Sequence, residues 1–213
     1  VKYIKFIIAF LLLTNASYVL AVACSDIFTN GIQAHAPNGN IRLRYHSTIT
    51  GGSATLAART LTDDSAWLAC SGSSCVVTGT AATKSTPTFL TGNGTNGAVN
   101  IGYQGSATIN SGSYTAINVG QEATLTFNSA NGVYYTGAVT TNFKSILRLQ
   151  SGDYWINGNL TIAQETVLRR IASSGPTRIF VNGSVTFGFK AFTEGFASNQ
   201  LLIYATGSIT SEN

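Results

Sequence analysis

A glycine followed by a short alternating strand recurs along the second half of this chain and constrains its fold more than any other feature. The motif is Gly-[Ser/Asn]-apolar-Thr-apolar, and its copies begin at Gly105, Gly158, Gly183 and Gly207. The last three copies lie 25 and 24 residues apart, and the first interval, 53 residues, is close to twice that, with Gly132 near its midpoint. A turn glycine and a period-2 strand returning at this interval are typical of β-solenoid coils, which must stack to bury their apolar faces.

The repeat predicts a mainly β chain that folds as a single-stranded right-handed β-solenoid (β-helix), with about five coils over residues 98–213. Residues 24–97 lack the repeat, and alternating segments such as 41–45 indicate a β-rich N-terminal cap region. We expect this region to cap the first coil, because an open coil end exposes unpaired strand edges. Since no polar cap follows Ile209, we expect the chain to be truncated or to continue into further domains.

Residues 1–23 are typical of a signal peptide. Lys2 and Lys5 precede an apolar run, and Ala21-Val22-Ala23 places small residues where signal peptidase cleaves. The apolar run is shorter than the roughly 20 residues that a membrane-spanning helix needs. We therefore expect an exported protein with no transmembrane helix in the mature chain, located in the periplasm, at the outer-membrane surface or outside the cell.

The three cysteines fit an exported chain. Cys70 and Cys75 bracket a four-residue turn, so we expect them to form a disulfide. Cys24 follows the predicted cleavage site directly, which makes it a candidate for lipidation; the alternatives are a free thiol and a bond to another chain. His35 and His46 have no second cysteine pair beside them, so the sequence predicts no metal site and no cofactor.

Charge is scarce in this sequence. Charged residues make up 9% of the chain and the formal net charge is +4, whereas ordinary soluble domains carry roughly 25% charged residues. Apart from Arg169-Arg170 there is no basic cluster, so the basic balance does not indicate nucleic-acid binding. Ser, Thr, Asn and Gly replace the charges, which suits an extracellular β-protein better than a cytoplasmic enzyme.

An enzyme built on a β-helix would need convergent carboxylates. Residues 163–171 could form two helical turns, but they align with 121–125, which favours a strand or loop and gives Glu122 and Glu165 equivalent coil positions. Two rungs of about 4.8 Å would separate this pair by about 10 Å, wider than a glycosidase pair needs. We interpret the coil acids as solvated turn carboxylates and predict no enzymatic activity, with a polysaccharide-degrading enzyme as the weakest alternative. The acids concerned are Glu122, Asp153, Glu165 and Glu194.

Four aromatic residues near coil turns are candidate ligand contacts. Tyr134, Tyr135, Tyr154 and Trp155 could stack on sugar rings if they are exposed, and the alternative is that they pack in the core or between coils. A carbohydrate-binding adhesin module is therefore one alternative function. The threonines of the repeat could also form an outward hydroxyl ladder on one face, as in ice-binding solenoids.

Longer stretches of the chain resemble one protein family. They are Cys-Ser-Asp-Ile-Phe-Thr-Asn-Gly-Ile-Gln-Ala-His from residue 24, the Cys-Ser-Gly-Ser-Ser-Cys loop, Ser-Gly-Asp-Tyr-Trp-Ile-Asn-Gly-Asn-Leu-Thr-Ile from 151, Gly-Pro-Thr-Arg-Ile-Phe-Val-Asn-Gly-Ser-Val-Thr-Phe from 175 and Asn-Gln-Leu-Leu-Ile-Tyr-Ala-Thr-Gly-Ser-Ile-Thr from 199. The combination resembles the N-terminal part of the MSHA biogenesis protein MshQ family, large exported bacterial proteins associated with a type IV pilus. The resemblance covers residues 24–213 and is sharpest over 151–210.

This resemblance implies a non-enzymatic exported surface protein that takes part in type IV pilus biogenesis or in pilus-linked cell adhesion. Its implied partners are pilus or cell-envelope proteins, and glycans in the adhesin alternative. The matching motifs are structural, and the family supplies no catalytic residues that could be placed on this chain.

Overall fold

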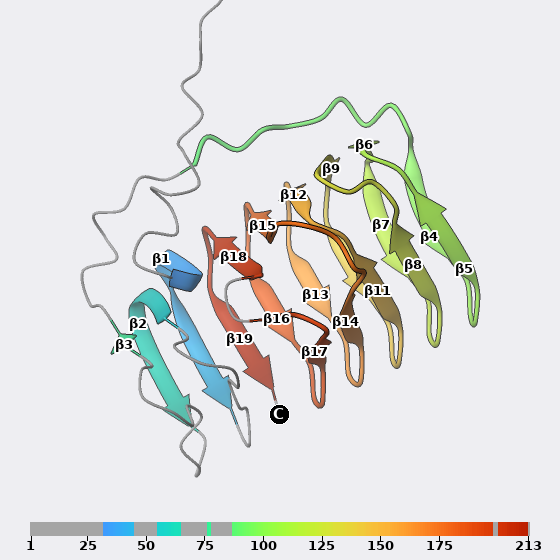
Figure 1. The fold of residues 1–213 in the computed structure, drawn as a ribbon. Coiled ribbons are helices and arrows are strands. Elements are labelled where there is room, and N and C mark those ends of the chain that lie inside the picture. Colours follow the sequence, from blue (N-terminus) through green and yellow to red (C-terminus); the bar gives the residue numbers. More distant parts are fainter. Residues whose placement is uncertain (1–31, 45–54, 65–75, 78–86, 198–199, 213) are drawn as a thin grey trace, which may run out of the picture.

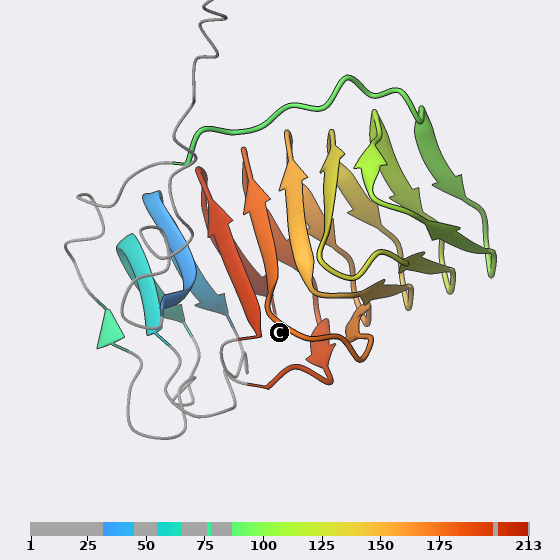
Figure 2. The ribbon, with the colours of Figure 1, turned by 45° about the horizontal axis from the view of Figure 1, so that its top comes forward.

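The computed structural model describes residues 32–44, 55–64, 76–77, 87–197 and 200–212. These residues form strands joined by turns, and no helix occurs among them. Successive coils stack with all their strands parallel, so that each coil presents one strand on each of three faces (Figures 1 and 2). The chain is therefore a mainly β protein with a β-solenoid fold, as its repeat predicts.

We call the three faces A, B and C, and each coil passes through them in the order A, C, B. Face A consists of β4 (Ala98–Ile101), β7 (Ala116–Val119), β10 (Val139–Thr141), β13 (Leu160–Ile162), β16 (Val185–Phe187) and β19 (Ile209–Glu212). Face C consists of β5 (Ser106–Ile109), β8 (Thr124–Phe127), β11 (Ile146–Leu149), β14 (Val167–Arg170) and β17 (Phe192–Glu194). Face B consists of β6 (Gly112–Ser113), β9 (Gly132–Thr136), β12 (Gly152–Ile156), β15 (Thr177–Val181) and β18 (Leu201–Ala205). Five complete coils thus run from β4 to β18, and β19 begins the next.

Coils stay in register because each rung places an apolar side chain at the same inward position. On face A the column runs from Val99 through Ile117 to Val139, and it continues through Leu160 and Val185 to Ile209. On face C, Leu125, Leu147 and Leu168 are paired in the same way and at most 2% exposed. Burial of these columns supplies the main stabilisation of each coil, at about 25 cal/mol per Å² of apolar surface.

One left-handed turn residue precedes every strand of face C. These residues have φ between 54° and 58°, and they are Gln104, Glu122, Lys144, Glu165 and Lys190. The turns stack through backbone hydrogen bonds: the amide of Glu122 donates to the carbonyl of Phe143, and that of Glu165 donates to Phe189. The equivalence of Glu122 and Glu165 and the strand within 163–171 are therefore confirmed.

The copies of the glycine motif are not all equivalent. Those at Gly158, Gly183 and Gly207 precede strands of face A, whereas the copy at Gly105 leads into β5 on face C and Gly132 begins β9 on face B. The expected two-coil interval after Gly105 is therefore wrong. Every coil contains three turn-and-strand units, so the same local pattern can occur on any face.

The N-terminal strands extend the far end of the solenoid. They are β1 (Ile32–Arg44), β2 (Thr55–Asp64) and β3 (Val76–Val77). In β1, Ala34 pairs with Ile203 of β18 on face B, and Ile41 pairs with Ile209 of β19 on face A. Strands β1 to β3 therefore extend the stack at the last coil, and the expectation that the N-terminal region caps the first coil is wrong for them. The edge left bare by β18 and β19 offers backbone groups that a parallel strand can satisfy, and β1 supplies that strand.

Residues 87–97, which we call the crossing segment, link this end of the molecule to the first coil. The segment runs along the outside of the solenoid from the side of β1 to β4 (Figures 1 and 2). The amide of Gly94 donates to Ser113 Oγ at 2.6 Å, and the amide of Asn96 donates to the Ser113 carbonyl at 2.9 Å. A Cβ on Gly92 would lie 2.6 Å from Cβ of Tyr135, so a glycine is needed where the segment meets face B.

Several sequence predictions concern residues outside the described ranges. The signal peptide, Cys24, and the disulfide between Cys70 and Cys75 all lie there and stay predictions. Within the described ranges, no helix is long and apolar enough to cross a membrane.

Candidate functional site: an uncharged outward face

Face A carries a column of amides and hydroxyls on its outer surface. Because strand residues alternate between core and surface, the residue after each buried column member points outward. The column is Asn100, Asn118, Thr140, Thr161, Thr186 and Thr210, one residue per rung from β4 to β19. At the first two rungs, Asn118 Nδ2 donates to Asn100 Oδ1 at 2.7 Å. The rungs are spaced by about 4.8 Å, so the face repeats one polar group at a fixed interval.

A second outward column runs beside the first. It is Ala98, Ala116, Ala138, Asn159, Ser184 and Ser208, each two residues before its neighbour in the first column. The amide of Ser184 donates to Asn159 Oδ1 at 2.9 Å, and that of Ser208 donates to Ser184 Oγ at 3.3 Å. Across these six rungs, both columns are small and uncharged. The uncharged surface ends at β1, where Arg42 pairs with Thr210.

Face C has a different outer surface. Its outward column contains Arg148, Arg169 and Glu194 in successive rungs. Arg169 Nη2 lies 2.8 Å from Glu194 Oε2. Phe192 at the end of this sheet is 51% exposed. These charged and bulky side chains interrupt a regular column of small polar groups. Face C is therefore the poorer candidate for contact with a repeating surface.

The outward column of face B is aromatic, and the crossing segment lies over it. Tyr135, Trp155, Phe180 and Tyr204 are paired rung to rung. The rings of Trp155 and Phe180 are stacked with centroids 4.2 Å apart, and Phe89 of the crossing segment meets Trp155 edge-on at 5.8 Å. Phe180 and Tyr204 are 0% exposed. Tyr135 and Trp155, two predicted ligand contacts, therefore face outward but are half-buried at this packed surface.

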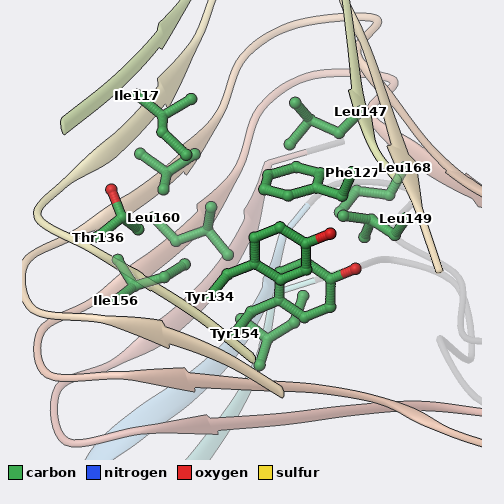
Figure 3. A pocket seen from close by; sticks show the side chains of 12 residues that line it. Ile117, Phe127, Tyr134, Thr136, Leu147, Leu149, Tyr154, Ile156, Leu160 and Leu168 are labelled. Atoms are coloured by element: carbon green, nitrogen blue, oxygen red, sulfur yellow. The ribbon is translucent and has the colours of Figure 1, made fainter. Parts of the chain in front are cut away.

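The other two predicted ligand contacts lie in the core. Tyr134 and Tyr154 are 1% and 4% exposed, and their rings are stacked 5.0 Å apart (Figure 3). The Tyr154 hydroxyl donates to the Gln150 carbonyl at 3.0 Å. Burial raises the pKa of Tyr154 well above its ordinary value, so the hydroxyl stays neutral. Neither ring reaches the surface to stack on a sugar, and the core alternative holds for both.

A small cavity lies beside this tyrosine pair. Its volume is about 20 Å³, and side chains from all three faces line it, including Ile117, Leu147 and Ile156 (Figure 3). Space of this size admits no organic ligand, and its largely apolar lining offers few partners to a water. A more open groove of about 250 Å³ lies between residues 91–94 of the crossing segment and the coil corner at Tyr114, Thr115 and Asn157. None of the described residues that line this groove is charged.

The coil carboxylates are engaged by neighbouring side chains. Gln104 Nε2 donates to Glu122 at 2.8 Å, and this bond lowers the pKa of Glu122. Lys144 occupies the turn between Glu122 and Glu165, with its Nζ 3.7 Å from Glu165 Oε2. Asp153 and Glu194 pair with Arg178 and Arg169 respectively. In the described part of the chain, no group of three or more His, Cys, Asp or Glu could hold a metal ion.

Comparison with known proteins gives little beyond the architecture. No family model matches the sequence, and no curated protein matches it. Among solved structures, the fold is similar to a glycosylated ice-binding protein (LeIBP) from an Arctic yeast, with 9% identity and a TM-score of 0.37. The similarity covers 91% of this chain and 94% of that chain. At this identity and TM-score it says nothing about what this chain binds.

Proposed function

We propose that this chain is an exported, non-enzymatic surface protein that takes part in type IV pilus biogenesis or pilus-linked adhesion, and that face A is its contact surface. The proposal joins two lines of support. The resemblance to the MshQ family supplies the cellular setting, and the uncharged double column of face A supplies the surface. The second of these carries the proposal, because it is the feature of the molecule that suits binding rather than chemistry.

Face A suits contact with a flat, repeating, uncharged partner. Each rung from Asn100 to Thr210 carries one outward hydroxyl or amide group in this column. A partner with a matching repeat could therefore form many equivalent hydrogen bonds. Each such bond contributes only about 1 kcal/mol net, and the rigid backing of the solenoid removes the cost of ordering them one by one. Such a surface binds through the sum of weak, pre-aligned contacts.

An in-frame deletion in the encoding organism tests the cellular setting. We expect cells lacking the protein either to lose surface pili or to keep their pili and adhere less. Pili are counted by electron microscopy, and adhesion is measured on the same cultures. Cells that keep both normal pili and normal adhesion would sink the proposal.

Ice binding is the second candidate, favoured by the regular spacing of the four threonines from Thr140 to Thr210. Their methyl and hydroxyl groups lie in one column, a surface that could order water in register with a crystal lattice. A charged residue first flanks this column at Thr210, which pairs with Arg42 of β1. The purified full chain should then inhibit ice recrystallisation, and Thr161→Lys should abolish the effect. Recrystallisation that proceeds as in buffer, with the chain folded, would exclude this candidate and leave adhesion untouched.

A further inference from the structure

The path of the chain places its two described ends on neighbouring rungs. Ile32 begins β1 on face B, and Glu212 ends β19 on face A. The rung formed by β1 runs parallel to the rung formed by β18 and β19, with pairs from Ala34 and Ile203 to Arg44 and Glu212. A load that enters before Ile32 and leaves after Glu212 therefore acts on two adjacent parallel rungs, pulling one backward and the other forward.

The direction of this load decides how the contact fails. Hydrogen bonds between rungs run along the solenoid axis, perpendicular to the strands. Because Ile32 and Glu212 lie on adjacent rungs, the line between them runs across the axis, in the plane of the rungs. The load therefore shears the bonds, and all of them must yield together. A pull along the axis would instead open one rung after another.

We propose that β1 and the rung of β18 and β19 form a mechanical clamp that resists tension between the two ends of the chain. Such a clamp would let a chain that is anchored in the cell envelope transmit force while its coils stay folded. The proposal does not depend on what face A binds.

Specific side-chain contacts reinforce the clamp on face A. Ile41 and Ile209, which are paired, are 2% and 6% exposed. The amide of Asn40 donates to Ser208 Oγ at 3.2 Å, and Arg44 Nη1 lies 3.2 Å from Glu212 Oε1. On its other side, β1 pairs with β2 over both faces, and Asn40 Nδ2 donates to Thr62 Oγ1 at 3.1 Å. β1 is thus paired on both sides and has no free edge from which it could peel outward.

Single-molecule pulling on the full chain tests the clamp. Handles on the two chain ends load it in shear. In a matched geometry, one handle replaces Tyr103 in the first coil, a residue that is 64% exposed, and the other stays at the C-terminal end. This second geometry bypasses β1 and pulls along the axis. We expect a higher first rupture force in the end-to-end geometry, followed by release of roughly 220 Å of chain as residues 32–97 extend at about 3.3 Å per residue.

A reversible staple identifies the contact that breaks. Arg42 and Thr210 are paired Cα to Cα on the outer surface of face A, so the double variant Arg42→Cys, Thr210→Cys can form a disulfide across the clamp. We expect the first rupture event to disappear when this variant is oxidised and to return after reduction. Thr210→Cys alone keeps the native cysteines without the bridge and should behave as the unmodified chain.

Two results would overturn the clamp. One is a first rupture at the same force in the end-to-end and bypass geometries. The other is a first rupture that persists unchanged in the oxidised, stapled protein. Either shows that β1 does not carry the load, whatever the outcome of the adhesion and ice experiments.

Discussion

At the scale of single residues, the buried tyrosines show how the core accommodates polar groups. The Tyr154 hydroxyl donates to the carbonyl of Gln150 and accepts from its amide at 3.2 Å, and the Tyr134 hydroxyl accepts from the amide of Ser129 at 2.8 Å. Each hydroxyl is thus satisfied by the backbone of the corner just before its own strand. This local bonding lets two stacked tyrosines fill a narrow core that would otherwise require apolar rings.

Replacing Tyr154 should change how stability depends on alkaline pH. Because burial raises the pKa of Tyr154, its contribution is complete below the ordinary tyrosine pKa of about 10 and is lost as the pH rises above that value. We expect Tyr154→Phe to destabilise the protein by about 1 kcal/mol at neutral pH, through the lost hydrogen bonds. It should also lose less stability than the unmodified chain between about pH 8 and about pH 11.

Urea denaturation at the two pH values measures both effects. Tyr103→Phe is the matched control, because Tyr103 is 64% exposed and its substitution should alter neither. An alkaline loss of stability that is the same with and without the Tyr154 hydroxyl would contradict the assignment.

At the scale of elements, the docking of β1 is the feature that local sequence could not reveal. Alternation over 41–45 predicts a strand, and β1 is that strand. These residues alone do not indicate which strand edge they join. The pairing with β19 places Ile41 in register with Ile209, which is far away in the sequence. Both ends of a solenoid expose strand edges that need a cap, and the crossing segment lets strands that precede the first coil in sequence join the last coil (Figure 1).

Truncating Ile41 tests this docking in solution. The side chain is 2% exposed, so Ile41→Ala should cost roughly 2–5 kcal/mol if β1 is the rung that follows β19. Arg42→Ala is the control on the outer face and should cost much less. Equal midpoints for Ile41→Ala and the unmodified chain in urea would show that β1 is not part of the folded stack.

The crossing segment should also contribute measurably to stability. Phe89 packs on Trp155 and Tyr204, so Phe89→Ala should destabilise the protein by about 1–2 kcal/mol, since a half-buried ring provides part of a full burial term. Trp155 should then be more accessible to acrylamide quenching. Leu90→Ala is the neighbour control, because Leu90 is 39% exposed; identical quenching in all three proteins would remove the segment from face B.

At the scale of the whole molecule, the stacked-coil architecture was predictable from the sequence. Which face each strand belongs to, and which side chains point inward, was not. The glycine repeat predicts stacked coils, and the alignment of Glu122 with Glu165 places two turns in correct register. The copy at Gly105 misleads because a turn and an alternating strand occur on each of three faces. Alternation along a strand predicts that one of Tyr134 and Tyr135 points into the core and the other points outward. It does not tell which of the two is buried.

Face A was only partly foreseeable. The threonines of the repeat predict an outward ladder on one face, and Thr161, Thr186 and Thr210 form it. Asn100 and Asn118 continue the ladder into the first coils, where asparagine replaces the threonine of the glycine motif. Their common Ala-x-Asn spacing was the signal that could have found them. The uncharged surface emerges only once the coils are aligned.

Lysines placed on face A test whether this face is the contact surface of the protein. In the deletion strain, we would restore the chain with Thr161→Lys and Thr186→Lys together. The matched control is Thr108→Lys and Thr126→Lys together, a paired set on the outer surface of face C. Adhesion and pilus number are measured for both, after confirming equal export and folding. We predict that the face A variant loses adhesion or pili as the deletion does, while the face C variant restores them. Full restoration by the face A variant would show that face A is not the contact surface.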